Sequence, residues 1–272
     1  MKKNTQTITI GFSPCPNDTF MFHAMIHKLV NTDDFRFVPY IDDVEALNQR
    51  AFQEKNQLQV SKLSFYAWLL LKDKYSLLDA GAALGSGCGP LLIAKTLPKN
   101  LADAKIAIPG KYTTASMLLR LWNPDLQNLV PTRFDKILPG LVSGKFDAGV
   151  IIHEGRFVYQ DYDCFKIADL GEWWETKTNL PIPLGCIAIR NDPETICHKE
   201  KIENILKDSI SYAFEHRQAS GAYIREYAQE LGESVIERHI HLYVNEYSLS
   251  LGGVGMQAVQ MLEGMVQCQK IL

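Results

Sequence analysis

The sequence predicts an α/β fold with two α/β domains and a cleft between them. Three observations support this prediction. Short apolar segments of strand type alternate with helical patterns as far as residue 190, the chain from about Lys199 onward carries helical patterns, and no Pro- or Ser-rich linker divides it. Alternation of this kind favours mostly parallel sheets covered by helices. The 272 residues are 46% hydrophobic and 22% charged, which is a globular composition, and the length allows two domains.

The expected strands are short apolar runs, either alternating with polar residues or continuous. They cover residues 7–12, 35–41, 59–63, 90–94, 105–109, 148–153, 165–170 and 185–190. Between and after these strands, apolar residues recur with the spacing of one helix face. The expected helices cover residues 19–30, 44–54, 114–122, 134–143, 201–215, 220–231, 234–244 and 254–269.

The order of these elements predicts how the domains are built. Residues 1–95 need helices to cover their sheet, and the C-terminal helices can supply them. The middle of the chain carries its own strand-helix-strand units. We therefore expect a discontinuous larger domain of residues 1–95 plus 188–272, and an inserted smaller domain of residues 96–187.

Composition excludes several classes of function. The formal net charge is −3, from 28 basic and 31 acidic residues, so nothing indicates a nucleic-acid binder. No apolar run approaches the roughly 20 residues that cross a bilayer. The first ten residues alternate Thr and Gln with Ile and lack the apolar region of a signal peptide, which favours a cytoplasmic protein. Six scattered Cys residues, without a Cys-x-x-Cys pair, favour buried thiols over disulfides.

The first candidate site is the turn Ser13-Pro14-Cys15-Pro16-Asn17-Asp18-Thr19, between the first strand and the first helix. Two prolines stiffen the turn, and Asn17 or Asp18 would cap the helix well. Ligands of α/β proteins bind at the carboxyl ends of strands, and the start of a helix favours an anionic group. A rigid capped turn without a ligand is the alternative interpretation.

The second candidate, Pro109-Gly110-Lys111-Tyr112-Thr113-Thr114-Ala115, has the same arrangement of strand, turn, hydroxyl residues and helix. Thr113 or Thr114 could cap the helix and also present a hydroxyl and an N–H to a carboxylate. The spacing is not that of a Walker A loop. Two such turns, one from each domain, could together bind one acidic ligand.

The third candidate is the segment Ile151-Ile152-His153-Glu154-Gly155-Arg156. The apolar run before His153 predicts a strand, and His153 would lie at its end. Histidine is the usual general base at neutral pH. The alternative is a histidine of the core or rim, with Glu154 and Arg156 as surface charges.

Other motifs are weaker. His23 and His27 share a helix face, but Ala24 stands where the zinc-protease motif has Glu, and no metal site is expected. The Gly-rich residues 85–90 lack dinucleotide spacing, so they indicate a flexible or closely packed turn. Lys62-Leu63-Ser64 closes a strand, again at a location typical of sites.

Taken together, these motifs resemble the 1,4-dihydroxy-6-naphthoate synthase family, late enzymes of the futalosine route to menaquinone. The resemblance covers nearly the whole chain in order. It is carried by residues 13–20 (SPCPNDTF), 62–64 (KLS), 85–92, 109–115, 151–157 (IIHEGRF), 169–184 (DLGEWWETKTNLPIPL) and 242–245. Val254 departs from the acidic residue that related sequences often carry there.

The resemblance implies a fold like that of type II periplasmic solute-binding proteins. It also implies a carbon–carbon lyase that cleaves cyclic dehypoxanthine futalosine to 1,4-dihydroxy-6-naphthoate without a cofactor. By motif, His153 would be the proton acceptor. The substrate-binding residues implied by the family are Lys62, Leu63, Ser64, Thr114 and Ala115; the first candidate turn adds Asn17 and Asp18.

Two alternatives stay open. Chorismate dehydratase shares the fold and pathway, although the His in IIHEGRF favours the later enzyme. A non-catalytic small-acid binding protein is the alternative from another class, because fold does not fix function. The expected partner is a small-molecule carboxylate substrate, with no nucleic acid and no membrane. A homodimer is common among soluble enzymes, although the sequence carries no interface signal.

Overall fold

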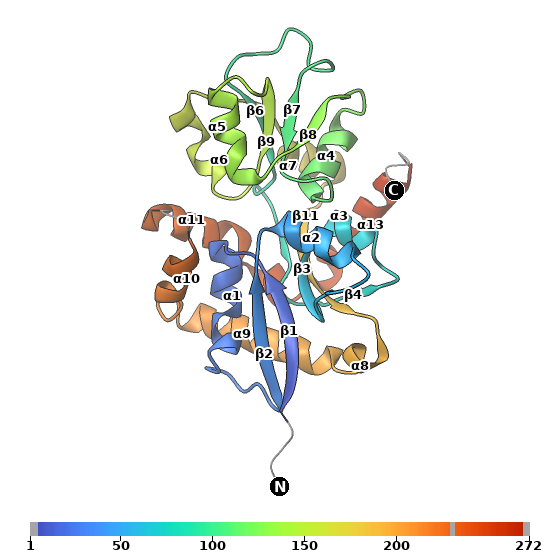
Figure 1. The fold of residues 1–272 in the computed structure, drawn as a ribbon, viewed down its shortest axis with the longest axis vertical. Helices are drawn as coiled ribbons and strands as arrows, with labels where there is room; N and C mark the ends of the chain where they lie inside the picture. The colour runs from blue at the N-terminus through green and yellow to red at the C-terminus, as the bar shows by residue number, and fades with distance from the viewer. Residues whose placement is uncertain (1–4, 229–231, 269–272) are drawn as a thin grey trace. The chain divides into compact units, whose positions relative to one another are not determined.

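The computed structural model describes residues 5–228 and 232–268. The chain forms two compact units (Figure 1). Unit 1 comprises Met1–Ala83 and Gly185–Gly253, and unit 2 comprises Leu84–Leu184 and Val254–Leu272. The sequence prediction grouped all the C-terminal helices with residues 1–95, whereas α13 (Gly252–Cys268) lies mostly in unit 2. An amphipathic pattern shows that a helix covers something, but it does not show which sheet the helix covers.

The sheet of unit 1 has the strand order β2-β1-β3-β11-β4, and β5 also pairs with β11. Strands β1, β2 and β3 run parallel, while β11 runs antiparallel to β3 and β4. These strands are β1 (Gln6–Phe12), β2 (Phe35–Ile41), β3 (Val60–Ser64), β4 (Tyr75–Leu77), β5 (Ala83–Gly85) and β11 (Ile182–Arg190).

Helices α1 (Pro16–Ile26), α9 (Lys199–Glu215), α10 (Gly221–Tyr227) and α11 (Glu233–Tyr243) pack together in unit 1, and α2 (Val44–Phe52) packs against β3 (Figure 1). Phe12, at the end of β1, stacks on Phe22 of α1 with ring centroids 4.5 Å apart. Both side chains are fully buried. Burying a side chain of this size stabilises a fold by about 1.5–3 kcal/mol, so the pair anchors the turn between β1 and α1. Shorter helices are α3 (Phe65–Leu69), α8 (Pro193–Ile196) and α12 (Glu246–Leu249).

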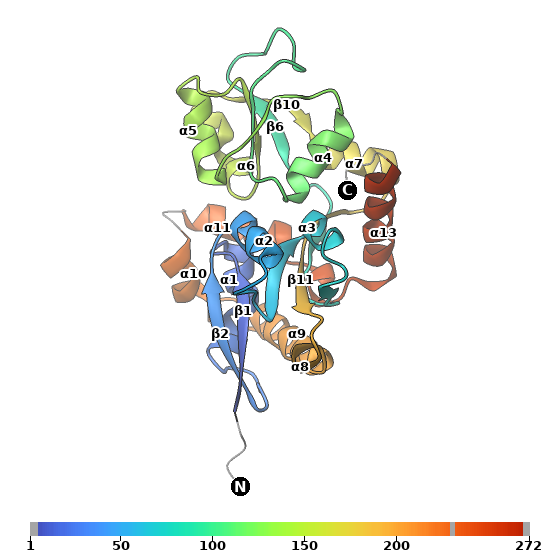
Figure 2. The same cartoon turned by 45° about the vertical axis from the view of Figure 1, so that its right-hand side comes forward.

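Unit 2 has a sheet of order β10-β6-β9-β7-β8 with helices beside it (Figure 2). Strand β7 is parallel to β8 and β9, while β6 is antiparallel to β9 and β10. The strands are β6 (Leu91–Ala94), β7 (Ile106–Ile108), β8 (Leu129–Pro131), β9 (Ala148–Ile151) and β10 (Phe165–Asp169). The helices are α4 (Thr114–Trp122), η1 (Phe134–Lys136), α5 (Ile137–Val142), α6 (Gly155–Val158), η2 (Tyr159–Tyr162) and α7 (Leu170–Thr178).

The predicted α/β class is confirmed, but the expectation of mostly parallel sheets is wrong for β6, β10 and β11. Parallel neighbours need a crossover connection, which is usually a helix, whereas antiparallel pairing accepts any connection. Strand β11 follows residues of unit 2 and has no helix of unit 1 directly before it. Its direction is therefore not constrained by a crossover.

Long elements agree with the sequence prediction better than short ones. The helix at Thr114–Trp122 and the strand at Phe35–Ile41 have the expected limits. The three-residue strands β4, β5 and β8 were not predicted, because so few residues show no period, whereas the three-residue strand β7 lies within the predicted strand 105–109. The ends of the expected helices 220–231 and 254–269, at residues 229–231 and 269, lie outside the described residues. Among the residues that the structure describes, no helix is both long and apolar enough to span a bilayer.

Candidate functional site

The first helix begins earlier than the sequence prediction placed it. Pro16 is the first helical residue, and Cys15, with an extended backbone, is its N-cap. The prediction that Asn17 or Asp18 caps the helix is therefore wrong. Proline is favoured at the first position of a helix because its fixed φ suits the helix and its missing N–H is not needed there. Asn17 and Asp18 instead lie within the first turn, where their side chains are buried.

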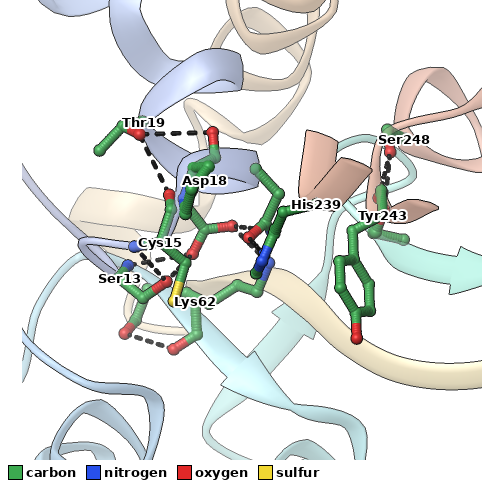
Figure 3. A network of polar contacts seen from close by, with 12 residues as sticks. Ser13, Cys15, Asp18, Thr19, Lys62, His239, Tyr243 and Ser248 are labelled. Atoms are coloured by element: carbon green, nitrogen blue, oxygen red, sulfur yellow. Dashed lines mark hydrogen bonds and ion pairs between the residues drawn. The ribbon is translucent and has the colours of Figure 1, made fainter. Parts of the chain in front are cut away.

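Asp18 is the centre of a buried polar network in unit 1 (Figure 3). One carboxylate oxygen, Oδ2, accepts from Ser13 N (3.0 Å) and from Ser13 Oγ (2.7 Å). The other, Oδ1, accepts from Asn17 Nδ2 (2.8 Å) and from Lys62 Nζ (2.7 Å). Each carboxylate oxygen therefore has two donors. A buried carboxylate needs such partners, because leaving water costs several kcal/mol per ion.

Lys62, the third of the five residues of β3, reaches Asp18, and 6% of its side chain is exposed. Strands β1 and β3 are parallel neighbours, so their carboxyl ends meet at one edge of the sheet. Gly185, on the adjacent strand β11, leaves room for the lysine, since a Cβ there would lie 3.1 Å from Lys62 Cε. The structure thus brings Lys62 to Asn17 and Asp18, which lie more than forty residues earlier in the sequence.

Leu63 and Ser64 lie next to Lys62 but have other contacts. The Leu63 side chain is fully buried in the core. Ser64 is joined to α2 by Asn48, whose Oδ1 accepts from Ser64 N (2.9 Å) and whose Nδ2 donates to Ser64 Oγ (3.0 Å). Any contact of Leu63 with a ligand would therefore come from its backbone.

His239 belongs to the same network, and the sequence analysis did not identify it. It lies on α11, is 0% exposed, and its Nε2 is 3.0 Å from Asn17 Oδ1 (Figure 3). Its ring centroid is 4.7 Å from that of Tyr243. A signal was present, because Ile236, His239, Ile240 and Tyr243 have the spacing of one buried helix face. A histidine in such a row needs a polar partner.

In unit 2, Thr113 is the N-cap of α4, as predicted for Thr113 or Thr114. Its Oγ1 accepts from Ser116 N (3.2 Å) and donates to Gly110 O (3.0 Å). Thr114 donates its hydroxyl to Leu184 O (2.7 Å). Thr114 and Ala115 are buried in the first turn of this helix. The amide groups at this end favour an anion by their orientation and by the helix dipole.

His153 follows β9, which ends at Ile151, two residues before the predicted limit. Because β7 and β9 are parallel neighbours, His153 and the α4 N-terminus lie at the same edge of the unit 2 sheet. His153 has a left-handed backbone, with φ of 54°. A left-handed residue other than glycine costs about 1 kcal/mol or more. The edge of the His153 ring meets the Phe134 ring with centroids 5.3 Å apart.

Arg156 holds the turn that contains His153. Its N–H donates to His153 O (3.3 Å), and its guanidinium donates to Gly89 O and to Asp169 Oδ2 (2.8 Å). The side chains of Arg156 and Asp169 are 17% and 9% exposed. The interpretation of Arg156 as a surface charge is therefore wrong. Glu154 is not a simple surface charge either, because burial, and then the nearby Asp135, raise its pKa.

Residues 85–90 are closely packed at Gly89, one of the two options left by the sequence, whereas Ser86 and Gly87 are exposed. A Cβ on Gly89 would lie 2.2 Å from Gly171 Cα, so two backbones meet here without side chains. Cys88 beside it is buried, and burial raises the pKa of its thiol to about 12. This cysteine is therefore protonated at neutral pH.

The two histidines of α1, His23 and His27, have ring centroids 4.6 Å apart. His27 Nδ1 is 3.0 Å from His23 O. Burial, and then His27, lower the pKa of His23. Within residues 5–228 and 232–268, no group of three or more His, Cys, Asp or Glu side chains could hold a metal ion.

Comparison with known proteins identifies close relatives. A protein from Thermus thermophilus named 1,4-dihydroxy-6-naphthoate synthase is 41% identical over 260 residues, covering 94% of this chain and 93% of its own. A protein of the same name from Streptomyces coelicolor is 38% identical over 262 residues, covering 94% and 92%.

Solved structures show the fold. The crystal structure of a protein from Archaeoglobus fulgidus has 34% identity and a TM-score of 0.91, covering 98% of both chains. A Candida albicans protein described as having the generic periplasmic binding protein fold has a TM-score of 0.70 at 11% identity, covering 98% of this chain and 91% of its own. The predicted periplasmic-binding-protein-like fold is confirmed. A family model described as menaquinone biosynthesis matches residues 8–267, and this chain therefore belongs to that family.

Proposed function

We propose that this protein is an enzyme that converts cyclic dehypoxanthine futalosine into 1,4-dihydroxy-6-naphthoate and releases a ribose-derived fragment. The proposal names a carbon–carbon lyase that needs no cofactor. Two relatives with that synthase name, each aligned over 94% of this chain, support it. The structural observation that carries it is His153, held in a left-handed turn after a strand, at the same sheet edge as the start of α4.

His153 acts as the general base in this proposal. Strain at a residue other than glycine persists only where its surroundings hold it, and such residues cluster at active sites. The Arg156 contacts to Gly89 and Asp169 provide this support. Proton abstraction from the substrate begins an elimination that leaves a stable naphthalene ring, and aromatisation supplies the driving force. A positioned base contributes roughly 10²–10⁴-fold to such a step.

The remaining residues bind the substrate in this proposal. The first turn of α4, with Thr114 and Ala115, receives the substrate carboxylate, since helix N-termini favour anions. The proposed substrate-binding residues of unit 1 are Asn17, Asp18, Lys62, Leu63 and Ser64. Hydrogen bonds among Asn17, Asp18 and Lys62, and between Ser64 and Asn48, fix these polar groups before a ligand arrives, which lowers the entropy cost of binding. The cleft between two domains that the sequence suggested stays a prediction.

The test is a product assay with purified protein and cyclic dehypoxanthine futalosine, read by chromatography and mass spectrometry. Wild type should form 1,4-dihydroxy-6-naphthoate. His153→Asn should lose at least about a hundredfold in kcat, the lower end of general-base contributions. Asparagine accepts the left-handed backbone of residue 153, so this variant removes the base and keeps the turn.

His241→Asn is the matched control, because His241 is an exposed histidine on α11. It should keep wild-type turnover. Near-wild-type turnover by His153→Asn would contradict the assignment of the base. Substrate that binds but returns intact from wild type would instead support a binding protein, and consumption of chorismate in a parallel incubation would support chorismate dehydratase.

A further inference from the structure

His239 contributes a polar contact that packing does not require. It is fully buried on α11 and comes from a segment more than two hundred residues after Asn17. Its ring packs on Tyr243, a contact that an apolar aromatic ring could also make. Burying a polar ring is unfavourable unless it forms a hydrogen bond, and the contact with Asn17 is one that a core phenylalanine could not make.

The hydrogen bonds around Asn17 determine how its amide is oriented. The group 2.8 Å from Asp18 Oδ1 must be the amide nitrogen, because a carboxylate oxygen only accepts. The amide oxygen of Asn17 is then the atom that lies 3.0 Å from His239 Nε2. Since a carbonyl oxygen cannot donate, Nε2 must carry the proton. The geometry thus selects one tautomer of His239.

The contact is continuous with the proposed substrate-binding residues. His239 donates to Asn17, Asn17 donates to Asp18 Oδ1, and the same oxygen accepts from Lys62 Nζ at 2.7 Å (Figure 3). Turning the Asn17 amide over would direct its oxygen at the carboxylate, and two acceptors would repel each other. The His239 proton favours the same orientation of the amide, and Asn17 thereby links α11 to the Asp18–Lys62 pair.

We propose that His239 is a positioning residue of this site, whose Nε2–H fixes the Asn17 amide and, through it, the Asp18–Lys62 pair. The inference rests on the proposed function, since it assumes that this pair serves substrate binding. His239 itself touches no substrate in this account. Its effect on the reaction passes through Asn17, and it requires a hydrogen-bond donor at the position of Nε2.

Two substitutions at the same position separate donation from packing. His239→Phe keeps a ring against Tyr243 and removes the donor. His239→Gln keeps an amide donor at about the same reach from the helix. His241→Gln, at the exposed histidine of the same helix, is the matched control. For each purified protein we would measure Tm, kcat and KM for cyclic dehypoxanthine futalosine, and the dissociation constant of the substrate by calorimetry.

We expect His239→Phe to lower kcat/KM by about tenfold or more, mainly by raising KM. Tenfold is the usual effect of losing one hydrogen bond. The Tm of this variant should stay within a few degrees of the wild-type Tm. His239→Gln should recover most of this loss, and His241→Gln should match wild type. Wild-type kcat/KM in His239→Phe would overturn the proposal. So would equal losses in the Phe and Gln variants accompanied by equal falls in Tm, because a purely structural role predicts that result.

A readout that does not depend on turnover keeps the two proposals apart. Nitrogen-15 NMR of the imidazoles should show His239 as the Nε2–H tautomer, and the Asn17 side-chain amide signals should shift in His239→Phe and return in His239→Gln. An Nδ1–H tautomer would overturn the inference even if wild type turns over the substrate. If wild type forms no product, the proposed function fails, and weaker substrate binding by His239→Phe alone would still support the positioning role.

Discussion

The two sheet edges that carry the proposed site are built in opposite ways. In unit 1, Asp18 and Lys62 are buried, each carboxylate oxygen of Asp18 has two donors, and both residues lie in regular elements, α1 and β3. In unit 2, His153 sits in a left-handed turn against an aromatic ring. The first edge holds its groups by polar contacts in a regular backbone, whereas the second holds its base in a strained backbone that the Arg156 contacts support. Removing a polar partner should therefore destabilise either unit, whereas a residue that accepts the left-handed backbone at position 153 should relieve strain in unit 2.

Asp18→Asn should have the largest effect on stability. The new amide cannot accept from Ser13, Asn17 and Lys62 together, and Lys62 loses its buried counter-charge. Breaking a buried ion pair from one side costs about 3–5 kcal/mol. Urea unfolding followed by circular dichroism should show a loss of this size, and the product assay should show little turnover.

Asp33→Asn makes the same chemical change at an exposed position where asparagine tolerates the left-handed backbone. It should change the free energy of unfolding by less than about 0.5 kcal/mol. Adding Lys62→Met to Asp18→Asn should restore part of the lost stability, because it removes the unpaired charge. Equal stability of Asp18→Asn and Asp33→Asn would show that the buried network does not hold unit 1 together.

Arg156→Lys should have an intermediate effect in unit 2. The guanidinium contacts Gly89 O and Asp169 Oδ2 at once, and a single ammonium cannot span both acceptors. Losing one such bond should cost about 1–2 kcal/mol. Amide hydrogen exchange in the turn from His153 to Arg156 should become faster, and kcat should fall because the base is held less firmly.

The control is Arg133→Lys, at an arginine whose side chain is 55% exposed and paired with Asp135. Exposed ion pairs contribute about 0–1 kcal/mol, so this variant should resemble wild type. If both lysine variants have the same exchange rates in the turn, the Arg156 contacts do not support His153.

The sequence was informative where a signal was local. The turn after β1, the Thr113 cap and the position of His153 at a strand end follow from short motifs and apolar periodicity. The contacts that join distant segments could not be predicted from the sequence, because no local pattern links Asn17 to His239 or Arg156 to Gly89. The direction of β11 and the grouping of α13 were missed for the same reason, since both depend on tertiary packing.

The smallest predicted effect tests the strain itself. At φ of 54°, glycine pays no steric penalty, whereas alanine pays about 1 kcal/mol. Both variants lack the imidazole, so both should be inactive, and their difference isolates the backbone. Glycine's larger entropy in the unfolded chain offsets part of the gain. We therefore expect His153→Gly to be more stable than His153→Ala by about 0.5–1 kcal/mol in urea unfolding.

The same pair of substitutions at Ser234, a helical and exposed position of α11, should give the reverse order, because glycine destabilises a regular helix. Alanine as the more stable variant at both positions would mean that the turn at residue 153 stores no strain, and the contrast between the two edges would then lie in their hydrogen bonds alone.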